Sequence, residues 1–258
     1  MKVAVAGAGG RMGRALIEAI GADDALTLAA ALDVAGSPSI GQEVAGIKVI
    51  SDISKAVSAA DILVDFTRPE GTMKHLDACL KQARPMVIGT TGFSDSEKKK
   101  ISEGAKTIPV VLSPNFAVGV NVLFKVVETA ARALGDDYDV EIVEAHHRHK
   151  VDAPSGTALK LGELIASASK TKLAEAAVHG RHGDTGERPM KQIGFHAIRG
   201  GDIVGEHTVL FIGAGERLEL AVRSQSRVTY ASGAVRAAKW LRERPAGLYD
   251  MFDVLGLR

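Results

Sequence analysis

Cysteine and aromatic residues are scarce in this chain, and its charges almost balance. The 258 residues include one cysteine, aromatic residues make up 4%, and the formal net charge is +1. A single thiol cannot form an intramolecular disulfide, and Cys79 lies in an apolar-periodic run that favours a buried core position. A nearly neutral chain lacks the basic field that draws proteins to nucleic acid or to anionic membranes. We therefore expect neither partner.

Long hydrophobic runs are also missing. No stretch approaches the roughly 20 apolar residues that span a bilayer, and MKVAVAGAGG lacks the longer apolar segment and cleavage site of a secretory signal. Hydrophobic residues at 46% and charged residues at 24% are typical of soluble globular proteins. These features predict a cytoplasmic protein of one large or two modest domains.

In the first half of the chain, short apolar runs alternate with stretches of helical period. Strands that alternate with helices predict a parallel sheet covered on both faces. The expected strands are residues 2–7, 26–33, 61–66, 85–89 and 109–113, and the expected helices are 11–20, 70–83 and 94–106.

The rhythm changes after residue 115. An amphipathic stretch predicts a helix over 118–134, and alternation predicts an extended strand over 138–150. A helix over 154–169 should carry Pro154 near its first position, where a missing N–H is harmless. Short glycine-containing turns then predict an antiparallel meander, and a last helix follows; the ranges are 191–199, 203–213 and 216–226 for the strands and 230–243 for the helix.

These patterns divide the chain into two domains. The first covers residues 1–117, with 228–258 returning to it. The second, over 118–227, is expected to be an α+β domain with a mainly antiparallel sheet. Its segment 170–190 is rich in glycine, histidine and charge and is predicted to be a mobile loop.

A glycine-rich turn joins the first strand to the first helix. Gly7, Gly10 and Gly13 permit a tight turn and let backbone N–H groups approach a pyrophosphate at the helix N-terminus. Asp33 ends the second strand, where a carboxylate accepts hydrogen bonds from a ribose diol. Together they indicate a Rossmann-like, doubly wound domain that binds a dinucleotide. There are two alternatives to this interpretation. The glycine turn could serve packing only, and Asp33 could simply cap the loop that follows it.

Two further loops follow parallel strands and should open on the same edge of the sheet. They are Gly89-Thr90-Thr91-Gly92 and Ser113-Pro114-Asn115-Phe116. Ligands of such sheets bind outside the carboxyl ends of the strands, so these loops are candidates for holding a nicotinamide. Asn115 and Phe116 are equally compatible with ordinary turn and core positions.

Potential positive charge is concentrated in EAHHRHKVDAPSG, residues 144–156. Reduction of a carbon–nitrogen double-bond system by a nicotinamide leaves a product that needs a proton, and a histidine such as His146 titrates near neutrality. Lys150 is a compact cation able to steady a carboxylate or a developing charge. The helix start at Pro154-Ser155-Gly156-Thr157 offers N–H groups and two hydroxyls as a second anion seat. Two such sites suit a dicarboxylate.

Three other interpretations of this cluster compete. His147 and His149 on one strand face would form a metal pair, but Arg148 and Lys150 would repel a divalent ion and no cysteine assists. Nucleic acid is disfavoured by the absence of interleaved aromatic residues. The cluster is also compatible with an ordinary surface strand that binds nothing. His149 is compatible with a structural role even if His146 is catalytic.

The chain resembles the dihydrodipicolinate reductase family, whose members are also called 4-hydroxy-tetrahydrodipicolinate reductases. Glycine fingerprints occur in many dehydrogenases, whereas the block EAHHRHKVDAPSGTA is highly specific. The matching stretches, spread over nearly the whole chain, are VAVAGAGGRMGR, VDFTRPEGT, VIGTTGF, PNFAVGVN, EAHHRHKVDAPSGTA and GGDIVGEHTV.

The resemblance implies a role for each site residue, and the charges of Arg148 and Lys150 lead us to expect no metal. His146 is implied as the proton donor and Lys150 as the second acid or charge stabiliser. His147, Gly156 and Thr157 are implied as substrate contacts, beside Ser155 of the predicted anion seat. The implied cofactor-binding residues are Gly7, Ala8, Gly9, Gly10, Arg11 and Met12 for the pyrophosphate, Asp33 for the adenosine ribose, and Gly89, Thr90, Thr91, Ser113, Pro114, Asn115 and Phe116 around the nicotinamide.

The resemblance also implies an activity, which is NADH- or NADPH-dependent reduction of a cyclic imine dicarboxylate. The imine derives from 4-hydroxy-tetrahydrodipicolinate, and the product is tetrahydrodipicolinate of the diaminopimelate route to lysine. Family members form homotetramers through the sheet of the second domain. The rival hypotheses are a reductase of another small dicarboxylate or imine, and an NADH-sensing module without turnover.

Val34 predicts that NADH is used at least as well as NADPH. Some family members carry arginine after the ribose-binding acid, but valine offers nothing to a 2′-phosphate and Asp33 repels one. Arg11 in the glycine turn is the one candidate for compensation. Steady-state kinetics with both cofactors measures the preference, and a large NADPH advantage in kcat/KM would contradict the prediction.

Overall fold

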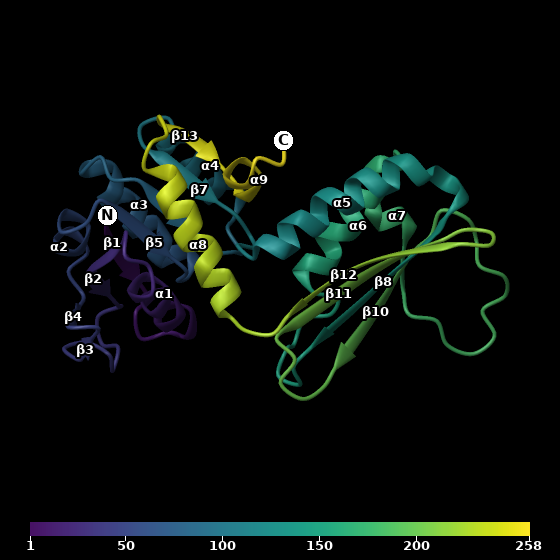
Figure 1. The fold of residues 1–258 in the computed structure, drawn as a ribbon, viewed down its shortest axis with the longest axis horizontal. Helices are drawn as coiled ribbons and strands as arrows, with labels where there is room; N and C mark the ends of the chain where they lie inside the picture. The colour runs from purple at the N-terminus through teal and green to yellow at the C-terminus, as the bar shows by residue number, and fades with distance from the viewer. The chain divides into compact units, whose positions relative to one another are not determined.

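The computed structural model describes residues 1–258, which form two compact units. Unit 1 comprises Met1–Val118 and Arg227–Arg258, and unit 2 comprises Gly119–Ser226. Each unit has its own sheet (Figure 1). No helix has the length and apolarity needed to cross a bilayer.

Unit 1 is built on an eight-stranded sheet of order β13-β7-β6-β5-β1-β2-β4-β3. Every neighbouring pair is parallel except the hairpin of β3 and β4. The strands are β1 (Lys2–Ala6), β2 (Thr27–Leu32), β3 (Glu43–Val44), β4 (Ile47–Ile50), β5 (Ile62–Asp65), β6 (Met86–Ile88), β7 (Pro109–Leu112) and β13 (Gly247–Tyr249). The predicted parallel α/β class is confirmed.

Helices cover both faces of this sheet, and β1 shows why the strands read as continuous apolar runs. Its side chains alternate between two cores, with Val3 and Val5 in one and Ala4 and Ala6 in the other. The helices are α1 (Arg11–Gly21), α8 (Val228–Leu241) and α9 (Met251–Leu255) on the first core, and α2 (Ile53–Ser58), α3 (Pro69–Lys81) and α4 (Asp95–Gly104) on the second.

Unit 2 contains a five-stranded mixed sheet of order β12-β11-β8-β10-β9, with its helices on one face (Figure 1). Alternate residues of β11 are buried, as expected for a sheet with one covered face. The elements are α5 (Val118–Leu134), the 3₁₀ turn Gly135–Asp137, β8 (Asp139–His146), α6 (Gly156–Ala168), α7 (Leu173–Ala176), β9 (Ala177–His179), β10 (Ile193–Arg199), β11 (Gly205–Ile212) and β12 (Arg217–Ser224).

The predicted meander is wrong at one step. β11 and β12 pair antiparallel as expected, but β10 does not pair with β11. Instead β8 lies between them, parallel to β10 and antiparallel to β11. A short connection is compatible with either arrangement, so turn chemistry alone could not exclude the insertion of an earlier strand.

The segment 170–190 has more structure than the predicted loop. It contains α7 and β9, and β9 extends the sheet parallel to β10. Arg181 and Arg188 then reach the carboxylate of Glu141 on β8 at 3.1 Å each.

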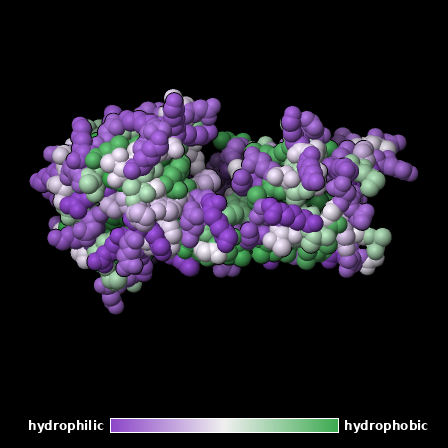
Figure 2. Space-filling model, turned by 90° about the horizontal axis from the view of Figure 1, so that it is seen from above, coloured by the Kyte–Doolittle hydropathy of each residue, from purple (hydrophilic) through white to green (hydrophobic).

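Figure 2 shows that hydrophilic residues cover most of the visible surface of each unit, with hydrophobic patches between them.

Gly233 tests the packing of α8 within unit 1. A Cβ at this position would lie 1.8 Å from the carbonyl oxygen of Phe116. We expect Gly233→Ala to lower the free energy of unfolding by about 1–3 kcal/mol, because the helix must move away from that backbone. Gly21→Ala at the end of α1 is the control, since no atom lies within 4 Å of its added Cβ. Urea denaturation compares the two, and equal stabilities would contradict the prediction.

Candidate functional site

Five loops of unit 1 open on one edge of its sheet. The last residues of neighbouring strands lie on the same rung, with Ala6 of β1 beside both Leu32 of β2 and Asp65 of β5. The same rung continues from Asp65 to Ile88 of β6 and on to Leu112 of β7. The predicted cofactor-binding residues all lie in the loops that follow these strands, except Arg11 and Met12, which are the first two residues of α1. In a doubly wound sheet this edge binds ligands, at the point where the strand order reverses.

The glycine turn after β1 has the conformation that the sequence predicts. Gly7 has a φ of +75°, and a Cβ on Gly13 would lie 2.1 Å from the carbonyl oxygen of Gly7. Helix α1 therefore approaches the turn as closely as a glycine allows. Its N-cap, Gly10, makes no side-chain hydrogen bond, and its first turn has no acidic residue. The first N–H groups of α1 therefore have no side-chain partner of the helix's own, an arrangement that favours a negatively charged ligand.

Asp33 follows β2 and is held against the glycine turn. It accepts hydrogen bonds from the hydroxyl of Ser39 at 2.7 Å and from the N–H groups of Gly9 at 3.0 Å and Val34 at 2.8 Å. Burial raises the pKa of Asp33, but these hydrogen bonds outweigh it and hold the pKa below its ordinary value. The carboxylate is therefore charged at neutral pH. Val34 is 72% exposed and contributes no polar group.

The two further predicted loops follow β6 and β7 at the same edge of the sheet. Thr90 is buried and its hydroxyl accepts from that of Thr72 at 2.9 Å, while Thr91 is exposed. The Phe116 ring is buried and packs against Phe66 after β5, with 5.2 Å between ring centroids. The remaining predicted residues of these loops are Gly89, Ser113, Pro114 and Asn115, of which Ser113 donates to the carbonyl of Asn115 at 2.9 Å.

The histidine cluster belongs to unit 2 and departs from the predicted strand. β8 ends at His146, so residues 147–150 form a turn rather than a continuing strand. The rings of His147 and His149 therefore do not share a strand face, although their centroids are 6.2 Å apart. No group of three or more histidine, cysteine or acidic residues is arranged to hold a metal ion.

His146 is held by a buried carboxylate. Its Nδ1 lies 2.6 Å from Oε2 of Glu144, which is 1% exposed. Burial lowers the pKa of His146 most strongly, Lys150 and Arg199 lower it further, and the contact with Glu144 raises it in part. The net pKa lies below the ordinary value, so the free imidazole is largely neutral at neutral pH.

Helix α6, whose start is the predicted anion seat, begins two residues later than expected. Ser155 is the N-cap of α6, Gly156 is its first residue, and Pro154 lies before the cap. The Ser155 hydroxyl accepts from the N–H of Ala158 at 3.2 Å and is 3.0 Å from Nε2 of His207. Thr157 lies in the first turn, which has no acidic residue. A negative ligand at this end is favoured by the helix dipole.

Lys150 and His147 complete the cluster. Lys150 forms an ion pair with Asp152 at 2.8 Å and keeps 20% of its side chain exposed. Nδ1 of His147 is buried and has no hydrogen-bond partner.

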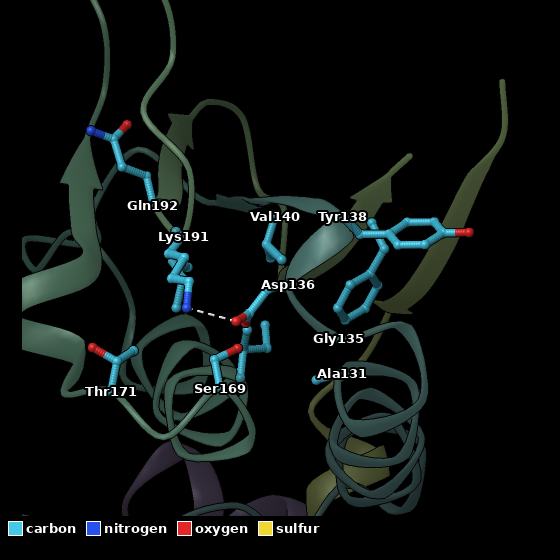
Figure 3. Close-up of a pocket in the computed structure, with 12 residues that line it drawn as sticks. Ala131, Gly135, Asp136, Tyr138, Val140, Ser169, Thr171, Lys191 and Gln192 are labelled. Atoms are coloured by element: carbon cyan, nitrogen blue, oxygen red, sulfur yellow. Dashed lines mark ion pairs between the residues drawn. The ribbon is translucent and has the colours of Figure 1, made fainter. Parts of the chain in front are cut away.

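A small cavity elsewhere in unit 2 includes none of these residues. It lies between the ends of α5 and α6, and the ion pair of Lys191 and Asp136 is part of its lining (Figure 3).

Four residues of the sites were not predicted. They are Ser39 beside Asp33, and Glu144, Arg199 and His207 around His146. Period-two alternation could have placed Glu144 on the same strand face as His146. Arg199 and His207 come from strands that are neighbours of β8 only in the folded sheet, so no local pattern indicates them.

A parallel sheet with an open glycine turn and a charged acid after its second strand defines a dinucleotide-binding protein of the Rossmann class. The sequence matches the family described as "Dihydrodipicolinate reductase, N-terminus" over residues 1–116 and "Dihydrodipicolinate reductase, C-terminus" over residues 119–255. The chain therefore belongs to the dihydrodipicolinate reductase family.

Relatives match over the full length. The 4-hydroxy-tetrahydrodipicolinate reductases of Cupriavidus metallidurans and Nitrosomonas europaea are each 55% identical over 100% of this chain and 100% and 99% of their own. A dipicolinate-bound dihydrodipicolinate reductase from Paenisporosarcina sp. TG-14 has a TM-score of 0.81 at 25% identity over 98% of both chains. An amine dehydrogenase from Mycobacterium smegmatis shares the fold, with a TM-score of 0.57 at 11% identity over 96% of this chain and 94% of its own.

Ser155→Ala tests the start of α6. The variant loses the helix cap and leaves the buried His207 without its hydroxyl partner, so we expect the free energy of unfolding to fall by about 1–2 kcal/mol. Ser167→Ala, at an exposed position on the same helix, should change it by less than about 0.5 kcal/mol. Thermal denaturation of both variants provides the measurement. A Ser155 variant as stable as the Ser167 variant would show that the cap contributes nothing.

Proposed function

We propose that this chain is an NADH- or NADPH-dependent reductase of the cyclic imine dicarboxylate derived from 4-hydroxy-tetrahydrodipicolinate. The product is tetrahydrodipicolinate, in the diaminopimelate route to lysine. The observation that carries the proposal is the arrangement of His146 and the N-terminus of α6 around one buried carboxylate, Glu144, in a chain of this family.

The residues of unit 1 fit a nicotinamide dinucleotide. The turn Gly7–Met12 brings backbone N–H groups to the uncapped start of α1, which suits a pyrophosphate. Asp33 presents a charged carboxylate where the ribose of such a ligand binds. The loops Gly89–Thr91 and Ser113–Phe116 are proposed to hold the nicotinamide. The bound cofactor supplies a hydride, which enters the conjugated imine.

NADH and NADPH differ only in the 2′-phosphate of the adenosine ribose. Asp33 remains charged, and Val34 beside it is exposed and apolar. The carboxylate of Asp33 repels a doubly charged 2′-phosphate, and residue 34 supplies no cation that would offset this repulsion. These features support the proposal that NADH serves at least as well as NADPH.

The residues of unit 2 fit the proton transfer and the substrate. Hydride addition leaves an enamine, whose carbon is proposed to receive a proton from His146 while Lys150 steadies the developing charge. A bound dianion near His146 raises its pKa, so the substrate itself promotes the protonated form of the donor. One substrate carboxylate is proposed to bind Ser155, Gly156 and Thr157 at the start of α6, and His147 offers its unpartnered Nδ1.

A homotetramer is proposed through the face of the second sheet that the helices leave uncovered. Ile198 on β10 and Ile212 on β11 are 52% and 37% exposed. Both lie on the face opposite to the buried residues of their strands, such as Phe195 and Phe211. Apolar side chains of this kind favour contact with a second copy.

An absorbance assay tests the function. NADH oxidation at 340 nm should depend on freshly generated imine substrate and should be absent without it. A panel of other imines and small dicarboxylates distinguishes a related reductase. Binding of NADH without substrate-dependent oxidation would support the sensing module and reject the proposed activity.

His146→Gln separates proton donation from binding. The variant keeps a polar side chain but cannot donate a proton as an acid, so kcat should fall by about 100-fold or more while KM changes little. Steady-state kinetics with saturating NADH gives both constants. A raised KM with an unchanged kcat would make His146 a substrate-binding residue instead.

A further inference from the structure

The sheet of unit 2 gathers four ionisable side chains on one face. Glu144 and His146 lie two residues apart on β8 and therefore point the same way. Arg199 on β10 is the cross-strand partner of His146, and His207 on β11 is the partner of Glu144. Three adjacent strands thus bring these groups together at the end of β8 where the turn to α6 begins.

Glu144 is the centre of this group. Arg199 donates to both of its carboxylate oxygens, at 2.7 Å each. The same two oxygens also contact Nδ1 of His146 at 2.6 Å and accept the N–H of Ser155 at 3.0 Å. Burial alone raises the pKa of Glu144, but the hydrogen bonds from Arg199 and His146 outweigh it and hold the pKa below its ordinary value.

We propose that Glu144 is the positioning residue of this active site, which sets both the donor nitrogen of His146 and the place of the anion seat on α6. The inference rests on the proposed function. An ionised carboxylate only accepts hydrogen bonds, so Nδ1 of His146 must carry its proton. Nε2 is then the nitrogen from which a second proton is gained and given away.

The contact between Glu144 and Ser155 explains how one carboxylate can position both the proton donor and the anion seat. Ser155 is the N-cap of α6, and its N–H is bound by the oxygen that Arg199 also holds. His207 fixes the Ser155 hydroxyl from the other side, at 3.0 Å. Burial lowers the pKa of His207 to about 4, so it stays neutral and adds no charge beside the anion seat. One carboxylate therefore sets the spacing between the proton donor and the first turn of α6.

Glu141 provides a matched control on the same strand. It also accepts from two arginines and a histidine, namely Arg181, Arg188 and His196. It is three residues from Glu144 and therefore points to the opposite face of the sheet, away from His146. Glu141→Gln and Glu144→Gln thus remove the same charge from similar networks, but only the second network includes the proposed donor.

The experiment compares the wild-type chain with these two variants. Glu144→Gln should lower kcat by about 10- to 100-fold, the range expected when a general acid loses its positioning, and should raise KM because α6 loses its anchor. Glu141→Gln should leave both constants within about twofold. Thermal denaturation of both variants accounts for any loss of folded protein.

The pH profile supplies a reading that a merely structural role would not change. A proton donor acts only while protonated, so kcat/KM falls as the pH rises through the pKa of His146. The charged or titratable groups facing His146 are Glu144, Lys150, Arg199 and His207, and only Glu144 raises its pKa. Glu144→Gln should therefore move the falling limb to lower pH, and Glu141→Gln should leave it in place.

Two further measurements make the outcome decisive. An NMR titration should show the pKa of His146 lower in Glu144→Gln than in the wild type, whether or not turnover occurs. Absence of imine-dependent NADH oxidation in the wild type would reject the proposed function, and the titration would still decide this inference. If Glu144→Gln does not fold, Glu144→Asp replaces it, with kcat expected to fall severalfold because the shorter arm cannot keep all contacts. An unchanged titration, or equal kinetics for the Glu144 and Glu141 variants, would overturn the proposal.

Discussion

A buried carboxylate must have its oxygens hydrogen-bonded if it is to remain charged, and Glu144 imposes this requirement on unit 2. With 1% exposure it depends on Arg199, His146 and the N–H of Ser155. These partners come from β10, β8 and the start of α6, so three elements are fixed by one group. Moving any of them would leave a charge unpaired away from water, and this cost makes the local geometry of the site rigid.

Unit 1 differs in that the backbone N–H groups at the start of α1 have no side-chain cap. Gly13 lets α1 approach the turn after β1 closely. Asp33 occupies part of this space through its contacts with Gly9 and Ser39. The proposed dinucleotide site therefore depends on glycines that lack side chains, whereas the proposed site in unit 2 depends on charged side chains that satisfy one another.

Local patterns predicted most elements because each depends on neighbours in the sequence. Strands β1, β2, β5, β6 and β7 follow from apolar periodicity, as do helices α1, α3, α4, α5 and α8 and the strand β8. The glycine turn follows from its spacing. The short elements β3, β4, β9, β13, α2, α7 and α9 were not predicted, and the other errors concern pairing and ends. The meander failed because β8 inserts between β10 and β11, and the strand predicted over 138–150 stops at His146 because the chain turns there toward α6.

The α/β class, the glycine turn with Asp33 and the cluster from His146 to Lys150 were all predictable from the amino-acid order alone, because these features lie within short segments whose chemistry is local. The amino-acid order also carried the family resemblance that full-length relatives confirm. The grouping of Arg199 and His207 with Glu144 and His146 became visible only in the folded sheet. Their contacts cross strands that lie about 50 to 60 residues apart in the chain, and such pairs meet only after the sheet has chosen its strand order.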